Sequence, residues 1–540
     1  MNQLNMKVSK IRCFVQARKM RVTVLLVMLS VAALAVGAGL SIFRPFPDDS
    51  GQVQSLPADD FVTQTTANGV AIPVTAPLDG TNKFFDPEFG TNGQACVTCH
   101  QPSDGLTIHV DSIQNAFQTT GLSDPLFRLN DTANNPNGPS TAANYSLVLN
   151  LGVIRIGKTF AAGSNFSATL ASTQPSTNDF GGPFPLGAGN NPIDPQQGAG
   201  HPTLSLFRRP LVNTNVHLDS SVLWDGRASI GNMRAQVIGA AKTLLLAPSP
   251  SNADSDQVAA FMLGVYTDQV FDTAAGTDAA GNCTFTAPGQ KCGAGLVSAE
   301  GARAGVRNLL NFALSPNVPC ANFLETPLGG GAGCVPNTPG YDLFNSWAKL
   351  PNAGRNAGRL SVVRGQEIFN TATLKVPADL AGQFGAGVTE IHCTTCHATR
   401  NIGNHPDSTF FRRVGTDSLD IIQGLINNPG NASSATLADV AALKDRVSEL
   451  PLYVLTSGSN SCGLTSVQTT DPGRAMVSGD ICDVGKFKPP ILRGLAARSP
   501  YFHAGAAENI QMLIHFYNAR FQIGLAEDQV NDLGAFLEAQ

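Results

Sequence analysis

The chain has 540 residues, of which 42% are hydrophobic and 14% are charged, and its formal net charge is −5. This balance excludes a polybasic surface for nucleic acid, and the apolar fraction excludes an intrinsically disordered chain. The length predicts two or three domains, and the 54 Gly and 34 Pro predict long irregular loops between their elements.

The N-terminus has the composition of an export signal. Six Lys and Arg residues between Lys7 and Arg21 precede a charge-free, mostly apolar run over residues 22–40, with small residues around Ala35–Ala38. These are the parts of a secretion signal, so we expect a periplasmic or otherwise exported protein. The run is at the lower length limit for a membrane span, which leaves an uncleaved anchor in the inner membrane as an alternative.

A Cys-x-x-Cys-His motif occurs twice in the chain, at residues 96–100 and 393–397. Two thiols at this spacing can add across the vinyl groups of one haem, and the adjacent His can ligate its iron. A zinc site would need the two motifs to pair across most of the chain, and a thioredoxin-type site would need a βαβ context that neither copy has. We therefore expect two covalently bound c-type haems. The residues that would hold them are Cys96, Cys99, His100, Cys393, Cys396 and His397.

Six other cysteines fall into neighbouring pairs within Gly/Pro-rich loops, which suits disulfides in an oxidising compartment. Local pairing is the simplest of about fifteen connectivities that six cysteines allow. It predicts bonds between Cys283 and Cys292, Cys320 and Cys334, and Cys462 and Cys482.

Helical periodicity dominates the regular parts of the sequence, and alternating strand patterns are few and short. The predicted helices cover residues 230–246, 302–312, 360–369, 437–450, 510–518 and 527–538. Residues 45–81 are expected to form a linker or extended arm, and residues 101–200 an insertion over the first haem. The predicted fold is mainly α, with two cytochrome c-like haem domains that carry long loop insertions. The predicted boundaries are 1–44 for the signal or anchor, 45–350 for the N-terminal haem domain and 351–540 for the C-terminal one.

Several further segments resemble the bacterial di-haem cytochrome c peroxidase and MauG family. Leu223-Trp224-Asp225-Gly226-Arg227-Ala228 is similar to the family's Phe-Trp-Asp-Gly-Arg-Ala. Residues 487–494 and 499–505 resemble its Phe-Lys-x-Pro-x-Leu-Arg-Asn and Pro-Tyr-x-His-Asp-Gly, and residues 360–369 and 525–537 resemble two of its helices. Residues of about 101–200 and 248–340 have no counterpart.

The resemblance implies roles around the first haem. Trp224 would lie between the two haems and carry electrons, although a Trp is also a common core residue. His201 stands at the register of a displaceable sixth ligand, with a solvated loop His as the alternative and His109 as a weaker candidate. Gln236 can take the place of the family's distal Gln.

The chain departs from the family where a distal Glu should follow. Residues 239–250 contain no carboxylate, and loss of a general acid/base typically lowers a rate roughly 10²–10⁴-fold. Ordinary peroxidase turnover is therefore in question, and an apolar distal wall is similar to that of di-haem rubber oxygenases.

Two arginines complete the predicted site. Arg227 would act beside Trp224, or the Asp-Gly-Arg turn could be only an ion-paired loop. Arg493 could bind a haem propionate, or form an ordinary surface salt bridge. A calcium ion between the domains would follow from the family, but Arg209 stands where its Asn ligand is expected.

The sixth ligand of the second haem is expected from the helix at 510–518. Ile510, Leu513, Ile514 and Tyr517 share one apolar face, so Tyr517 points inward, whereas His515 lies about 200° around the helix. The MauG branch of the family uses a Tyr at this register, and we expect Tyr517 to ligate this iron, with His515 or Met512 as alternatives.

The sequence thus predicts an exported di-haem oxidoreductase that uses hydrogen peroxide or oxygen. Its redox partner would be a small cytochrome c or cupredoxin as electron donor, or another protein as substrate, and no nucleic acid is involved. The alternatives are a di-haem oxygenase of an apolar substrate and a non-catalytic electron carrier.

Overall fold

The computed structural model divides the chain into two units, Met1–Arg44 and Pro45–Gln540. It describes residues 53–57, 81–101, 104–171, 203–216, 219–265, 267–272, 341–342, 344–349, 352, 356–399 and 402–540, all within the second unit. The predicted export signal, the helix at 302–312, His201 and the four cysteines between Cys283 and Cys334 lie outside these residues. Among the helices that the structure describes, none is long and apolar enough to cross a membrane.

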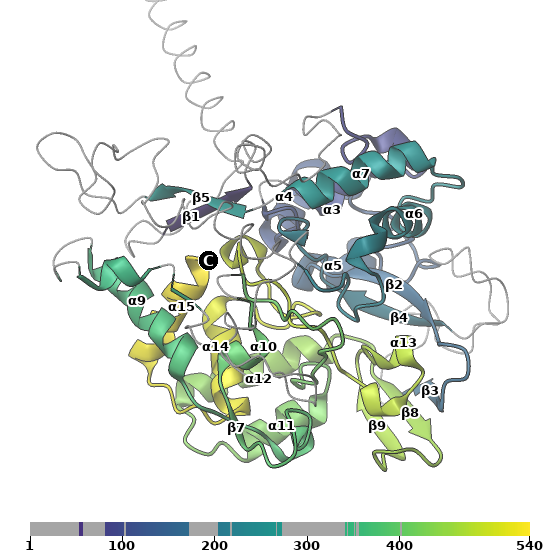
Figure 1. Cartoon of the computed structure of the whole chain (residues 1–540). Helices are drawn as coiled ribbons and strands as arrows, with labels where there is room; N and C mark the ends of the chain where they lie inside the picture. The colour runs from purple at the N-terminus through teal and green to yellow at the C-terminus, as the bar shows by residue number, and fades with distance from the viewer. Residues whose placement is uncertain are drawn as a thin grey trace, which may run out of the picture. The chain divides into compact units, whose positions relative to one another are not determined.

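The described part of the chain is partly helical, with short strands (Figure 1). Its α-helices are α3 Cys96–Cys99, α4 Val110–Thr120, α5 Ser146–Leu151, α6 Met233–Thr243, α7 Asn252–Gly264, α9 Asn356–Thr371, α10 Cys393–Cys396, α11 Leu419–Asn427, α12 Ser434–Ser448, α13 Ala475–Ser478, α14 Ile510–Arg520 and α15 Glu527–Glu538. Its strands are β1 Val53–Pro57, β2 Ile154–Thr159, β3 Phe166–Leu170, β4 Thr203–Arg208, β5 Thr267–Asp272, β6 Leu374–Lys375, β7 Glu390–Ile391, β8 Tyr453–Ser457 and β9 Ser466–Thr469.

The C-terminal helices α9, α12, α14 and α15 pack around one hydrophobic core (Figure 1). Gly365 of α9 lies so close to α15 that a Cβ there would be 1.9 Å from the Asp532 carbonyl oxygen, which explains the glycine in mid-helix. Arg364 of α9 also links the two helices, through a bidentate ion pair with Asp532 of α15 at 2.6 and 2.7 Å. This helix pair supports α10, which carries the second Cys-x-x-Cys-His motif.

A second hydrophobic core lies beside the first motif. It joins the chain around Phe84 to α6 and α7, and includes Val237, Leu245, Val258 and Phe261. Cys96 of α3 packs against it. The two motifs therefore rest on separate cores, in the N-terminal and C-terminal parts of the described chain.

The strands connect segments that are distant in sequence. β2 pairs antiparallel with β4, from Ile154 opposite Arg208 to Thr159 opposite Thr203. β3 adds to the β8–β9 hairpin, with Phe166 opposite Ser457. Part of the predicted insertion at 101–200 thus pairs with strands beyond residue 450, across the boundary predicted at 350.

The predicted helices agree with the structure wherever it describes them. The helix at 527–538 has the expected bounds, and α6, α9, α12 and α14 overlap the other four. Helices α4, α7 and α11 were not predicted. Polar residues interrupt the apolar pattern of α7, whose burial is a tertiary effect. In α4, Val110, Ile113 and Phe117 do have helical spacing, which our prediction missed.

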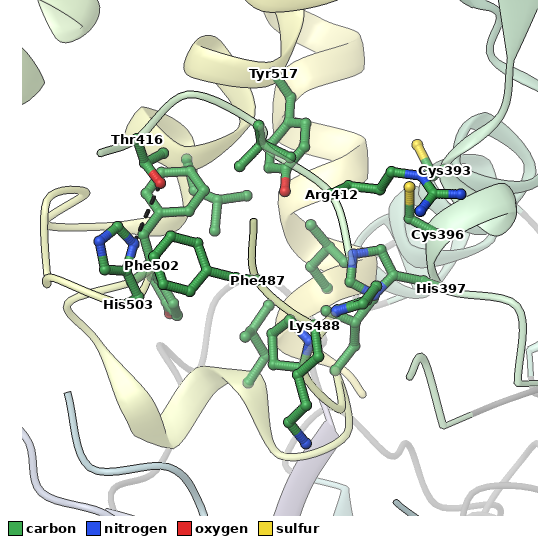
Figure 2. Close-up of a pocket in the computed structure, with 18 of the residues that line it drawn as sticks. Cys393, Cys396, His397, Arg412, Thr416, Phe487, Lys488, Phe502, His503 and Tyr517 are labelled. Atoms are coloured by element: carbon green, nitrogen blue, oxygen red, sulfur yellow. Dashed lines mark hydrogen bonds between the residues drawn. The ribbon is translucent and has the colours of Figure 1, made fainter. Parts of the chain in front are cut away.

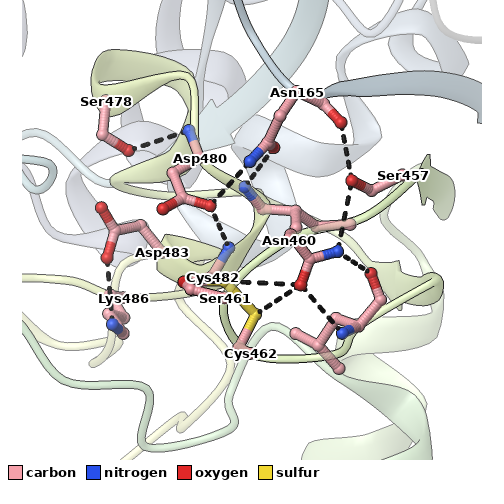
Figure 3. Close-up of a disulfide and its surroundings, with 12 residues drawn as sticks. Asn165, Ser457, Asn460, Ser461, Cys462, Ser478, Asp480, Cys482, Asp483 and Lys486 are labelled. Atoms are coloured by element: carbon pink, nitrogen blue, oxygen red, sulfur yellow. Dashed lines mark hydrogen bonds and ion pairs between the residues drawn. A yellow bond between two sulfur atoms is a disulfide. The ribbon is translucent and has the colours of Figure 1, made fainter.

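Of the three predicted disulfides, the bond between Cys462 and Cys482 is confirmed, with an S–S distance of 2.09 Å (Figure 3). It closes the loop between β8 and the turn after α13. Asn165, at the start of β3, fastens the same turn by donating to Asp480 Oδ1 at 2.9 Å and accepting from the Ile481 amide at 2.9 Å. The other two predicted disulfides lie outside the described residues.

A buried ion network ties strand β4 to the C-terminal loops. Arg208 is 1% exposed and donates to both carboxylate oxygens of Asp471, at 2.6 and 2.8 Å, and to Asp225 Oδ2 at 2.7 Å. Burial alone would raise the pKa of Asp225, but Arg227 and Arg208 outweigh it and lower this pKa to about 2. Arg208 thus bridges two carboxylates from distant segments, and Arg227 supplies the second cation of the network.

Removal of Arg208 should therefore destabilise the protein strongly. We expect Arg208→Ala to lower the free energy of unfolding by about 3–5 kcal/mol, because it leaves two buried carboxylates without their shared cation. Arg234→Ala is the matched control, since Arg234 pairs with Asp256 at the surface, where the two side chains are 51% and 48% exposed. Urea unfolding of both variants measures the difference, and an equal effect of the two would contradict the role of the network.

Candidate functional site

The two Cys-x-x-Cys-His motifs adopt the same local structure. Each forms a single helical turn, α3 or α10, which begins at the first Cys and ends at the second. Residues three apart on a helix lie on one side, so the two thiols of each motif face the same space. A Thr hydroxyl accepts a hydrogen bond at 3.0 Å from the amide before each helix, Thr98 from Ala95 and Thr395 from His392.

Each motif histidine is held by a backbone carbonyl six residues further on. His100 Nδ1 lies 2.9 Å from the Leu106 carbonyl oxygen, and His397 Nδ1 bonds to the Gly403 carbonyl oxygen. A carbonyl partner fixes Nδ1 as the protonated nitrogen, which leaves the lone pair on Nε2. Burial also lowers the pKa of both histidines to about 4. Both imidazoles are therefore neutral at pH 7, in the form that ligates a metal.

The motifs open into two large cavities. We call the one lined by Cys96, Cys99 and His100 the first cavity, and the one lined by Cys393, Cys396 and His397 the second cavity. Their empty volumes, open mouths included, are about 1950 and 1480 Å³. The second cavity is shown in Figure 2.

Trp224 lines both cavities. Its indole Nε1 donates to the Arg209 carbonyl oxygen at 2.9 Å, and its own carbonyl oxygen accepts from the Lys488 amide at 3.0 Å. These bonds join the turn at 222–228 to β4 and to the C-terminal loop. The predicted bridging residue is thus part of the wall that the two cavities share. The other residues of that wall are Arg209, Pro210, Leu211, Val212, Lys488 and Pro490.

Tyr517 lines the second cavity, together with His397. It comes from α14, and Figure 2 shows its hydroxyl directed into the space between Phe487 and Arg412. Burial raises the pKa of this phenol well above its ordinary value. The other two α14 candidates do not line either cavity. His515 bonds to Asp439 at 2.7 Å and Glu527 at 3.2 Å, and Met512 accepts from the Glu508 amide at 3.4 Å.

Three buried nitrogen atoms around the second cavity have no hydrogen-bond partner: His503 Nε2, Arg412 Nε and Arg498 Nε. His503 stacks on Phe487 with 4.1 Å between ring centroids and meets the edge of Trp224 at 6.3 Å (Figure 2). Two of these nitrogens belong to cations, so this wall suits an anionic group such as a carboxylate. Such donors fit the propionates of a haem.

Arg493 is buried, at 2% exposed, and does not line either cavity, whereas Arg498 and Arg412 line the second. The role of Arg493 toward a haem propionate stays a prediction. Arg412 lies outside the quoted motifs and had no sequence signal, while Arg498 directly precedes the Ser499–Gly505 motif and His503 lies within it.

Gln236 and Arg227 both line the first cavity, and their catalytic roles stay predictions. Helix α6 supplies its apolar wall through Val237, Ala240 and Ala241. Arg227 also bonds to Asp225 Oδ2 at 2.9 Å, so the Asp-Gly-Arg turn is ion-paired while its arginine still faces the cavity.

Neither of the two histidines predicted as a sixth ligand of the first haem belongs to the described wall of the first cavity. His109 caps α4 by accepting from the Asp111 amide at 3.1 Å, and its Nε2 bonds to the Ser499 hydroxyl. It therefore does not line the first cavity. His201 lies outside the described residues, so its role stays a prediction.

The side chain of Arg209 is surrounded by backbone carbonyl oxygens. Its guanidinium donates to Gly152 at 2.6 Å, to Ile108, and to Arg498 and Ser499 at 3.4 and 3.3 Å. Carbonyl oxygens are also calcium ligands, so an arginine here uses groups that a cation could bind. Within the described ranges no group of three or more His, Cys, Asp or Glu could hold a metal ion. The calcium site stays a prediction without a described ligand set.

Comparison with known proteins does not place the chain in a family, because no family model and no curated protein matches it. The resemblance to the di-haem peroxidases therefore rests on the sequence motifs quoted above.

Proposed function

We propose that the protein is an exported di-haem c-type oxidoreductase of the cytochrome c peroxidase and MauG type. One observation carries this proposal: each Cys-x-x-Cys-His turn presents two thiols and a carbonyl-anchored, neutral His to its own large cavity, and Trp224 lies in the wall between the two. Nothing in a zinc or dithiol site requires two such cavities with a shared aromatic wall.

The residues present fit a haem in each cavity. Cys96 and Cys99 would attach one haem and Cys393 and Cys396 the other, with His100 and His397 as the iron ligands. Bound haem would supply a redox-active iron to each cavity and a position for hydrogen peroxide or oxygen. Arg412, Arg498 and His503 supply unpaired donors for the carboxylates of the second haem.

The two cavities would have different roles, one in electron transfer and the other in binding the oxidant. Tyr517 lines the second cavity with His397 and would be a further ligand of a haem bound there, which would suit electron transfer rather than the binding of an oxidant. The first cavity holds Gln236 and Arg227, polar groups that can orient a small oxidant. Electrons would pass between the cavities by way of Trp224. They would come from a small redox protein such as a cytochrome c or cupredoxin, or from another protein as substrate.

A second candidate is a di-haem oxygenase of an apolar substrate. The α6 wall of the first cavity favours it, because Val237, Ala240 and Ala241 are apolar and α6 contributes no charged side chain to this cavity. Consumption of peroxide with a redox protein as donor supports the first proposal, whereas oxygen uptake driven by an apolar substrate supports the second. A protein whose irons bind neither oxidant would be an electron carrier.

The haem content tests the basis of the proposal. We expect the wild-type protein to contain two covalent haems per chain. The double variant Cys96→Ser/Cys99→Ser should contain one, as should Cys393→Ser/Cys396→Ser, because each pair holds its own cofactor. The pyridine haemochrome spectrum measures this number. Cys462→Ser/Cys482→Ser is the control and should keep two haems. A wild-type protein without covalent haem would contradict the proposal.

The ligand role of Tyr517 has a spectroscopic test. Tyr517→Phe removes only the hydroxyl, so we expect the electron paramagnetic resonance signal of one haem to change while the other stays as it is. His515→Gln lies on the same helix outside the cavity and should leave both signals unchanged. Identical spectra for Tyr517→Phe and the wild type would exclude the phenol as a ligand.

The bridging role of Trp224 has a kinetic test. Trp224→Phe should slow electron transfer between the two haems while both haems are retained, because the indole in the shared wall is lost. Stopped-flow absorbance after partial reduction follows this transfer. Val212→Ala changes the same wall without removing an aromatic ring and should transfer electrons at the wild-type rate. An unchanged rate in Trp224→Phe would show that electrons take another route.

A further inference from the structure

A buried carboxylate from the unaligned insertion faces the first cavity. Asp131 lies in the loop between α4 and α5, is 2% exposed, and lines this cavity together with Cys99, His100 and Gln236. No sequence motif singles out Asp131, because the insertion has no counterpart in the family that the chain resembles.

The loop of Asp131 is fastened to the C-terminal end of α6. Asn130 Nδ2 donates to the Leu244 carbonyl oxygen at 3.0 Å, and Asn92 Nδ2 donates to the same oxygen at 2.8 Å. The Asp131 carbonyl oxygen accepts from the Arg155 amide of β2 at 2.5 Å. Asp131 therefore stands beside residues 239–250, the segment in which the expected distal carboxylate is missing.

The Asp131 carboxylate accepts hydrogen bonds but has no ion pair among the described residues, and the backbone amides of Asp131 and Thr132 are among its hydrogen-bond partners. Gln94 Nε2 approaches its Oδ1 at 3.4 Å. No Lys or Arg in the described part of the chain forms an ion pair with it, and the nearby Arg128 donates to the carbonyl oxygens of Asn92, Asp124 and Phe127 instead. Lys158 also lines the cavity. A fully buried Asp is usually paired with a cation, and within the described ranges this one is not.

We propose that Asp131 is the general acid/base of the first cavity, in place of the carboxylate that α6 lacks. This inference rests on the proposed function, because it assigns a role within the reduction of hydrogen peroxide. The carboxyl group shares the cavity with His100 and Gln236, and its loop is attached to the wall that should have carried the missing group.

Cleavage of hydrogen peroxide requires a group that moves a proton from one peroxide oxygen to the other. Reduction of hydrogen peroxide breaks its O–O bond and consumes two electrons and two protons to give two waters. The electrons come from the redox-protein donor. The Asp131 carboxylate would accept a proton from one peroxide oxygen and return it to the other as that oxygen leaves as water. Its own protonation is then unchanged over the cycle, and the two protons that are consumed come from solvent.

The electrostatics of the group suit this role. Burial raises the pKa of Asp131 to about 7, against the opposing effects of Gln94 and Arg128. A group with a pKa near the working pH both accepts and donates a proton readily. Because the folded pKa lies above that of an unfolded Asp, this group favours folding most at acid pH, and its contribution falls as the pH rises through about 7.

The test compares Asp131→Asn, Asp131→Glu and the wild type as holoproteins. Asp131→Asn keeps the shape and removes the exchangeable proton, so we expect its rate of peroxide reduction to fall roughly 10²–10⁴-fold at unchanged haem content. Asp131→Glu should recover part of the rate. Asp111→Asn is the matched control, because Asp111 lies in the same segment with its side chain 62% exposed, and it should react as the wild type does.

An infrared titration gives a readout that is independent of turnover. The wild type should show the C=O band of a buried carboxylic acid that disappears as the pH rises through about 7, and Asp131→Asn should lack this band. Wild-type rates in Asp131→Asn, or no such band in the wild type, would overturn the role of Asp131 and leave the proposed function intact. A haem-loaded wild type that does not reduce peroxide would instead overturn the proposed function, and the role of Asp131 with it.

Discussion

The buried pairing of Arg208 with Asp225 and Asp471 is the interaction on which the arrangement of the two cavities depends. Arg208 ends β4, Asp225 belongs to the turn that carries Trp224, and Asp471 belongs to the loop after β9. Three separate segments therefore meet at one guanidinium. Because an unpaired charge at this depth would be costly, the segments cannot separate without a large loss of stability. The wall that contains Trp224 is held in place as a result.

The two motifs show how a short sequence determines a local geometry. In both, a Thr hydroxyl caps the helical turn, and the His is anchored by a carbonyl six residues later. The anchoring residues differ, Leu106 in one copy and Gly403 in the other, and both have a positive φ. A backbone contact of this kind depends on the conformation of the loop and not on its side chains, so the two copies need not resemble each other beyond the motif.

Among the residues that the structure describes, cations line both cavities, but carboxyl groups, those of Asp131 and Asp219, line only the first. The second carries unpaired donors of Arg412, Arg498 and His503 and a phenol from α14. The first carries the carboxyl group of Asp131, with Gln236 and Arg227. Donors suit the binding of anionic groups, while a carboxyl group suits the movement of protons. This asymmetry supports a division between a site of electron storage and a site of reaction.

The sequence alone determined the features that depend on residues close together in the chain. The thiol and histidine positions, the helices at 360–369 and 510–518, the inward direction of Tyr517 and the bond between Cys462 and Cys482 all follow from spacings of a few to about twenty residues. Only the tertiary structure decided which distant side chains complete each cavity. It placed Arg498 in the wall of the second cavity and Asp131 beside the end of α6. The physical reason is that loop segments are positioned by long-range hydrogen bonds and buried ion pairs. The spacing of residues along the chain does not indicate which distant residues form these contacts.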